Sequence, residues 1–166
     1  MEAFKSMKVD RREQCLEIAR KILLEVAAAS KPLRSSFHVQ PIPELDLSLD
    51  FDVQPGLSFP VSANLQNADE LQLAVGEVFC CNWFPCDDPR VVSEFREAML
   101  GIISGEYRVV EFYRNDKPIR AELQRPTGET WIKAATYSKQ RLPSLVRMRT
   151  RILRNAPGRS LCPPPD

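Results

Sequence analysis

The most unusual stretch of the chain is VFCCNWFPC at residues 78–86, in which three cysteines surround a tryptophan. Thiols can bind a metal, form a disulfide or act as nucleophiles, and each use needs its own geometry. A structural zinc site takes four converging ligands, usually supplied as separated pairs such as CxxC. Cys80 and Cys81 are adjacent, so on a strand their side chains point to opposite faces and are poorly placed to share one ion. We therefore predict no metal ion and no other cofactor.

The same cysteines carry no familiar redox or catalytic motif. There is no CxxC pair, although a strained disulfide between Cys80 and Cys81 is an alternative. Cys86 is the best candidate for a nucleophile, because it precedes a predicted helix whose dipole would lower the pKa of the thiol. The neighbouring Asp87 and Asp88 would raise that pKa. Free cysteines are among the most buried residues, so we interpret the stretch as core and leave the redox state of its three thiols open.

Other catalytic motifs are absent from the sequence. It contains no GxSxG elbow, no GxxxxGKS or GxxxxGKT phosphate loop, no GxGxxG and no HExxH. A Ser-His-Asp triad would have to use His38, the one histidine. Most of the acidic residues are explained as helix caps, turn residues and solvent-facing strand positions. The sequence thus favours a protein without catalytic activity, and an enzyme whose site assembles from distant residues is the alternative.

The segment LVRMRTRILR at residues 145–154 is a candidate anion-binding surface. A row of arginines can attract phosphates, an acidic protein or an anionic membrane surface. The candidate residues for partner or anion binding are Arg147, Arg149, Arg151 and Arg154. Alternation of apolar residues with arginines fits a strand, whereas the start at Pro143 and an apolar helical face fit a helix. We prefer the helix, because proline commonly opens one.

In a second interpretation, acidic residues of the same chain neutralise these arginines. The predicted strand LDLSLDFDV at residues 45–53 alternates apolar residues with Asp46, Asp50 and Asp52. If the basic segment were a strand beside it, the arginines would lie across from these acids and the charges would pair. Nucleic acid is disfavoured as a partner, since the net charge is +1, the sequence pI is about 7.6 and no aromatic residue follows position 142.

Composition places the chain among soluble globular proteins. It has 166 residues, of which 43% are hydrophobic and 27% charged, enough for one domain with a core. No apolar run approaches the roughly 18 residues that a membrane helix needs. The N-terminal sequence has no apolar signal-peptide region, so we expect a cytoplasmic protein with reduced thiols.

The elements that must position these residues can be assigned from pattern. Residues 10–30 predict an amphipathic helix capped by Asp10, and residues 88–105 predict a second one that starts with Asp88 and ends at Gly105. Extended segments at 45–53, 57–63 and 71–80 precede the second helix, and segments at 107–113, 119–125 and 129–137 follow it. We predict a single domain at 1–154 and a disordered proline-rich tail at 155–166.

This order of elements predicts an α+β fold. We expect a mainly antiparallel curved sheet covered on one face by the two amphipathic helices, with a basic terminal helix or strand. The helix–strands–helix–strands order is similar to that of small secretion-chaperone-like domains. This resemblance implies a protein-binding module that forms a homodimer.

Two functions follow as hypotheses. The leading one is a cytoplasmic, non-catalytic binding or adaptor protein, chaperone-like, with an unidentified protein partner. The alternative is a small-molecule-binding protein or enzyme with a pocket between sheet and helices. The aromatic residues that would line such a pocket are Trp83, Tyr113, Trp131 and Tyr137.

Overall fold

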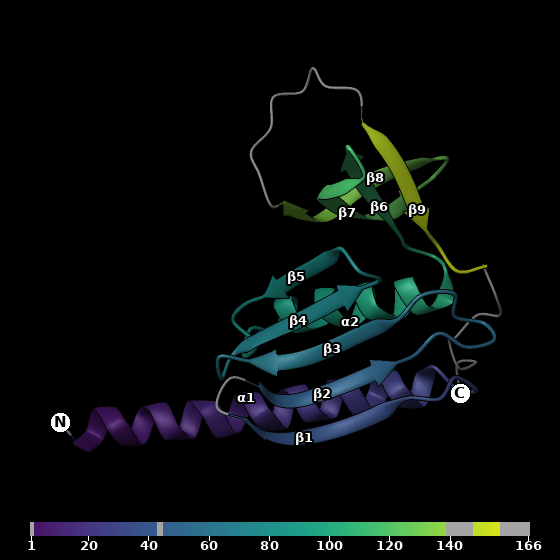
Figure 1. The fold of residues 1–166 in the computed structure, drawn as a ribbon. Coiled ribbons are helices and arrows are strands. Elements are labelled where there is room, and N and C mark those ends of the chain that lie inside the picture. The colour runs from purple at the N-terminus through teal and green to yellow at the C-terminus, as the bar shows by residue number, and fades with distance from the viewer. Residues whose placement is uncertain (1, 43–44, 139–147, 157–166) are drawn as a thin grey trace.

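The computed structural model describes residues 2–42, 45–138 and 148–156, which form two helices and nine strands (Figure 1). The helices are α1 (Glu2–Ala29) and α2 (Pro89–Ser104). Before α2 come β1 (Ser36–Ile42), β2 (Leu45–Phe51), β3 (Val61–Gln66), β4 (Glu70–Val75) and β5 (Phe79–Trp83). After α2 come β6 (Arg108–Arg114), β7 (Lys117–Thr127), β8 (Thr130–Ser138) and β9 (Arg149–Leu153).

The strands form two antiparallel sheets, which confirms the α+β class. The first is a meander in the order β1-β2-β3-β4-β5, and the second has the order β8-β7-β6-β9. We had expected one sheet, and the difference arises at α2, which separates β5 from β6 in the chain and interrupts the meander. The second sheet packs against the first through β5, which contacts β7 and β8.

The two helices cover one face of the five-stranded sheet and lie behind it in Figure 1. On α1 the buried residues recur at helical spacing, namely Cys15, Ala19, Ile22, Leu23 and Val26. On β2 the predicted apolar positions Leu47, Leu49 and Phe51 are buried in the core, but Ser48 between them is buried as well. The predicted apolar position Val53 lies beyond the strand and is exposed. The buried face of α1 and the buried face of β2 therefore pack together in one apolar core.

The second helix begins and ends at the predicted residues. The Asp88 side chain accepts a hydrogen bond of 2.9 Å from the Arg90 backbone N–H, and Pro89 occupies the first turn. Gly105 ends the helix with a left-handed φ of 79°. The first helix differs from the prediction at its start, because it extends back from Asp10 to Glu2 through residues that include no helix breaker.

The basic terminal segment is a strand where it is described, so our preference for a helix was wrong there. Arg149–Leu153 form β9, which pairs with β6 and not with β2. The β-branched Thr150 and Ile152 favour a strand, and Leu153 at its end is buried in the core. Residues 143–147, including Arg147, lie outside the described residues.

Asn155, which we had placed in the tail, is buried and hydrogen-bonded. Its side-chain amide donates to the carbonyl oxygens of Ile102 and Ile103, at 3.2 Å each, and its carbonyl oxygen accepts from the Ser58 N–H at 3.1 Å. The packed part of the chain therefore includes Asn155, whereas residues 157–166 of the predicted tail lie outside the described residues.

Candidate functional site

The outer face of the four-stranded sheet collects arginine and aromatic side chains from strands that are distant in sequence. The inner face is apolar, since Val109, Leu123 and Leu153 are buried in the core. Side chains alternate along a strand, so the neighbouring positions point outward. The outer-face residues that matter here are Arg108, Phe112, Arg120, Glu122, Gln124, Trp131 and Arg154.

Two guanidinium groups lie on one indole ring. The central carbon of the Arg108 guanidinium is 4.1 Å from the centre of the Trp131 ring, and that of Arg154 is 4.9 Å from it. Both are cation–π contacts, since each cation lies within about 6 Å of the ring centre. We call Arg108, Gln124, Trp131 and Arg154 the Arg–Trp site.

Each of the two guanidiniums is fixed by one hydrogen bond. Arg108 Nε donates to Gln124 Oε1 at 2.9 Å, and Arg154 Nε donates to the Gly105 carbonyl oxygen at 2.8 Å. A guanidinium has five N–H donors, so each group keeps donors for a further acceptor. The site therefore presents two oriented cations whose rotamers are already restrained.

No carboxylate forms an ion pair with Arg108 or Arg154 among the residues that the structure describes. Elsewhere on the same sheet, Arg120 pairs with the carboxylate of Glu122. Burial lowers the pKa of the Arg108 guanidinium, and the nearby positive charge of Arg154 lowers it further. The two cations thus repel each other, and a bound anion would relieve that repulsion.

The Arg–Trp site belongs to the basic half of a charge-polarised chain. Residues 1–104 contain ten Lys or Arg and sixteen Asp or Glu, whereas residues 105–166 contain thirteen Lys or Arg and six Asp or Glu. The division falls at the end of α2, so the four-stranded sheet lies in the basic half. A net charge of +1 for the whole chain conceals this separation.

The arginines predicted to act as one row are divided between the two faces of the sheet. Arg149 and Arg151 lie on the inner side near Glu111, and Arg154 lies on the outer face. Arg149 approaches Asp116 at 3.4 Å, and Arg151 approaches Glu111 at 3.9 Å. These two charges are paired within the chain, but with acids other than the β2 aspartates that the second interpretation named.

Of the four predicted pocket aromatics, Trp131 lies on the outer face of the second sheet, and the other three pack against the core. Trp83 packs edge-on against Phe95, with ring centres 5.6 Å apart and a 70° angle between the planes. Tyr113 and Tyr137 pack against the core, and Trp131 is in the Arg–Trp site. A shallow surface pocket lies instead along α1, lined by Glu13, Leu16, Glu17, Arg20, Lys21 and Leu24.

Glu111 is a buried carboxylate at the inner edge of the second sheet. Its Oε2 accepts a 2.7 Å hydrogen bond from the Tyr113 hydroxyl, and its Oε1 has no hydrogen-bond partner in the described part of the chain. Burial raises the pKa of Tyr113, and the hydrogen bond to Glu111 raises it further. No nucleophile adjoins this pair among the described contacts, so we interpret it as the polar link that attaches β9 to β6 through Arg151.

The cysteine stretch, which we interpreted as core, is buried only in part, because Asn82 and Phe84 are exposed. Phe79 and Cys86 are fully buried, while Cys80 and Cys81 are half-buried and pair with Ala74 and Leu73, on opposite faces of the sheet. Burial raises the pKa of the Cys86 thiol, which opposes the nucleophilic thiolate. Within the described residues, no three or more His, Cys, Asp or Glu side chains are grouped as metal ligands.

Comparisons with protein-family models, curated proteins and solved structures found no match to this chain. Neither described helix is long and apolar enough to span a membrane. Inference about function therefore rests on the geometry of the molecule. Sequence reasoning named Trp131 and Arg154 for different hypothetical sites and missed Arg108 and Gln124, because only strand pairing brings these four side chains together.

Proposed function

We propose that the chain is a non-catalytic binding protein and that its Arg–Trp site binds a carboxylate of an acidic protein partner. The observation that carries this proposal is the pair of guanidiniums on Trp131, neither of which has a carboxylate partner among the described residues. Guanidinium forks bind carboxylates through strong, directional hydrogen bonds.

The surroundings of the site resemble those of protein-binding hot spots. Tryptophan and arginine are the residue types most enriched at such positions. Ile152 shares the outer face, because it pairs with Val110, which pairs with Glu122, and 54% of its surface is exposed. An acidic residue beside an apolar one in the partner would match both features.

Glu122 argues for a protein and against a nucleic acid. Its carboxylate lies on the same face and accepts a 3.1 Å hydrogen bond from Gln124, which also contacts Arg108. Glu122 is buried and paired with Arg120, so of the arginines named on this face only Arg108 and Arg154 lack a carboxylate among the described residues, which suits a single carboxylate better than a row of phosphates.

The proposal is tested by fluorescence anisotropy with a labelled poly-glutamate peptide at low salt. We expect binding that weakens as salt rises, and a loss of about tenfold or more in affinity when Arg108→Gln and Arg154→Gln are combined, because two charge-assisted contacts disappear. Arg125→Gln is the matched control, since Arg125 is exposed on β7 and is outside the site.

Two results would contradict the proposal. One is equal peptide affinity for the wild-type protein and the Arg108→Gln/Arg154→Gln variant. The other is tighter, Arg108-dependent binding of a labelled single-stranded oligonucleotide of matched charge, which would identify the site as one for nucleic acid.

A further inference from the structure

Two buried cysteines from distant parts of the chain meet where α1 packs against the loop before α2. Cys15 on α1 and Cys86 in that loop are both fully buried in the same core, and each thiol raises or lowers the pKa of the other. Arg11, four residues before Cys15, hydrogen-bonds to Asp87, the neighbour of Cys86, so the segments that carry the two cysteines are held together. The other two described cysteines, Cys80 and Cys81, point to opposite faces of β5 and do not share this arrangement.

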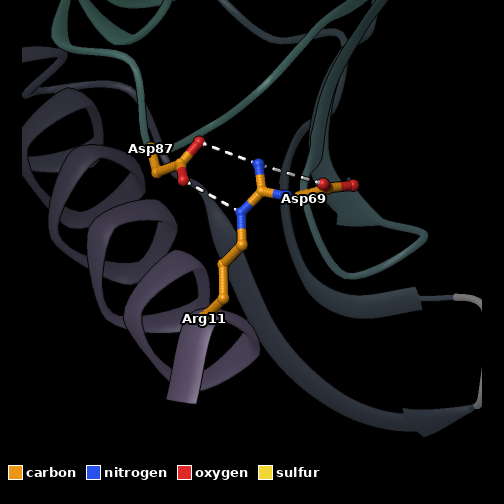
Figure 2. Close-up of polar contacts among 3 residues, drawn as sticks. All are labelled: Arg11, Asp69 and Asp87. Carbon is orange, nitrogen blue, oxygen red and sulfur yellow. Dashed lines mark hydrogen bonds and ion pairs between the residues drawn. The ribbon is translucent and has the colours of Figure 1, made fainter. Parts of the chain in front are cut away.

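A charged cluster lies beside the two sulfurs, and Figure 2 shows it. Arg11 donates hydrogen bonds to both carboxylate oxygens of Asp87, at 2.9 and 3.1 Å, and approaches Asp69 at 3.6 Å. We call these three residues the Arg11 clamp. Arg11 precedes Cys15 by four residues, so both lie on the same face of α1. The Cys86 N–H also donates to the Asp69 carbonyl oxygen at 3.0 Å.

We propose that Cys15 and Cys86 form a site for reversible oxidation to an internal disulfide by a small-molecule disulfide such as oxidised glutathione. One cysteine, as its thiolate, attacks a sulfur of the oxidant and expels one small thiol, which leaves a mixed disulfide on the protein. The second cysteine attacks that mixed disulfide and expels the second small thiol. The protein loses two hydrogen atoms and two electrons, and the oxidant gains them.

The closed structure protects the pair, so the Arg11 clamp controls the rate. Both thiols are shielded from solvent, and burial raises the pKa of each. Reaction therefore proceeds through local opening of α1 away from the two loops. The clamp opposes this opening, because Arg11 ties α1 to the loop that contains Asp87 and to the turn that contains Asp69. The resulting disulfide would join two of these segments covalently, namely α1 and the loop before α2.

The experiment incubates the full chain with oxidised glutathione, blocks free thiols with N-ethylmaleimide under denaturing conditions, and maps the products by mass spectrometry. We expect one species that carries N-ethylmaleimide on three of its five cysteines, a cross-linked peptide that joins Cys15 to Cys86, and reversal by dithiothreitol. Cys80→Ser leaves this cross-link intact, because Cys80 is outside the pair.

The rate of cross-linking tests the Arg11 clamp. We expect the Arg11→Gln variant to form the Cys15–Cys86 cross-link several-fold faster than the wild-type chain. The Arg96→Gln variant, which loses an ion pair with Glu25 of α1 remote from the sulfurs, is the control and should form the cross-link at the wild-type rate.

Three results would overturn the inference. Both cysteines could remain fully blocked by N-ethylmaleimide after prolonged oxidation of the wild-type chain, which requires no variant to fold. The cross-link could instead involve Cys80, Cys81 or Cys162. Equal rates for Arg11→Gln and wild type would refute the role of the clamp. None of these results bears on peptide binding at the Arg–Trp site.

Discussion

Individual arginines of this protein are stabilised in two different ways. Arg11 and Arg120 meet carboxylates, whereas Arg108 and Arg154 lie on the face of Trp131. A carboxylate neutralises the cation, but an aromatic ring attracts it and leaves its charge in place. The second arrangement keeps positive charge available at the surface, which is why we place the binding site there.

The Arg11–Asp87 pair predicts a pH dependence of stability. The hydrogen bond from Arg11 holds the pKa of Asp87 below its ordinary value, which is about 3.9. A carboxylate whose pKa is lowered by folding stabilises the native state above the unfolded pKa, and this contribution is lost as pH falls through the folded pKa. Burial raises the pKa of Asp69, so Asp69 acts in the opposite direction.

We therefore expect the difference in melting temperature between wild type and Arg11→Gln to be larger at neutral pH than at about pH 3. Thermal unfolding followed by circular dichroism at both pH values measures it, with Arg125→Gln as a control that shows little difference. A difference that grows as pH falls would contradict the assigned role of Asp87.

Among the elements, α2 depends most clearly on partners from elsewhere in the chain. Its last carbonyl groups accept hydrogen bonds from Asn155, and the carbonyl of Gly105 accepts one from Arg154. The residues that follow β9 therefore complete the C-terminal end of α2. This attachment also positions Arg154 beside Trp131.

A substitution at Gly101 tests whether side-chain packing or helix propensity has the larger effect on stability. Alanine is the better helix former by about 1 kcal/mol. However, a Cβ at position 101 would lie 2.4 Å from the nearest ring atom of Tyr107, which also donates its N–H to the Gly101 carbonyl. We expect Gly101→Ala to lower the free energy of unfolding by about 1–2 kcal/mol, because overpacking outweighs propensity.

Urea denaturation measures this change, and a second variant separates the two effects. When Tyr107→Leu removes the ring, Gly101→Ala should become neutral or stabilising relative to Tyr107→Leu alone. If Gly101→Ala stabilised the protein with Tyr107 present, the packing argument would be wrong.

At the scale of the whole molecule, the two sheets meet where the turn between β4 and β5 approaches β9. Gly76 in that turn has a φ of 62°, and a Cβ there would lie 2.6 Å from Leu153 Cδ1 and 3.6 Å from Glu111 Oε1. Gly128 has a nearly equal φ of 60°, but no atom lies within 4 Å of its Cβ position. Both glycines thus have a left-handed backbone conformation that would strain any substituted residue, and they differ in how closely other atoms pack around them.

We expect Gly76→Ala to destabilise the protein by about 1 kcal/mol more than Gly128→Ala does, because only the first also displaces β9. Chemical denaturation gives this difference, and hydrogen exchange should show faster exchange for the amides of β9 in Gly76→Ala alone. Equal losses of stability together with unchanged exchange would mean that Leu153 adapts without moving the strand.

Much of the local structure could be predicted from the sequence. Asp88, Pro89 and Gly105 mark the limits of α2, because capping depends on neighbouring residues. The apolar alternation of β2 identifies its buried side for the same reason. The secondary structure of the basic segment 149–153 could not be predicted in this way, because its pattern fits a helix and a strand alike. Its pairing with β6 makes it a strand.

The sequence by itself determined the α+β class, both helices, several strands and the supply of arginines and aromatic residues. It did not separate β4 from β5, since the one extended segment predicted at 71–80 is two strands that pair with each other. Tertiary structure alone decided that the strands form two sheets, that Arg108 and Arg154 share Trp131, and that Cys15 and Cys86 are buried in the same core. The physical reason is distance along the chain. Capping and periodicity act within a few residues, whereas strand register and the packing of a helix on a loop join residues that no local pattern relates.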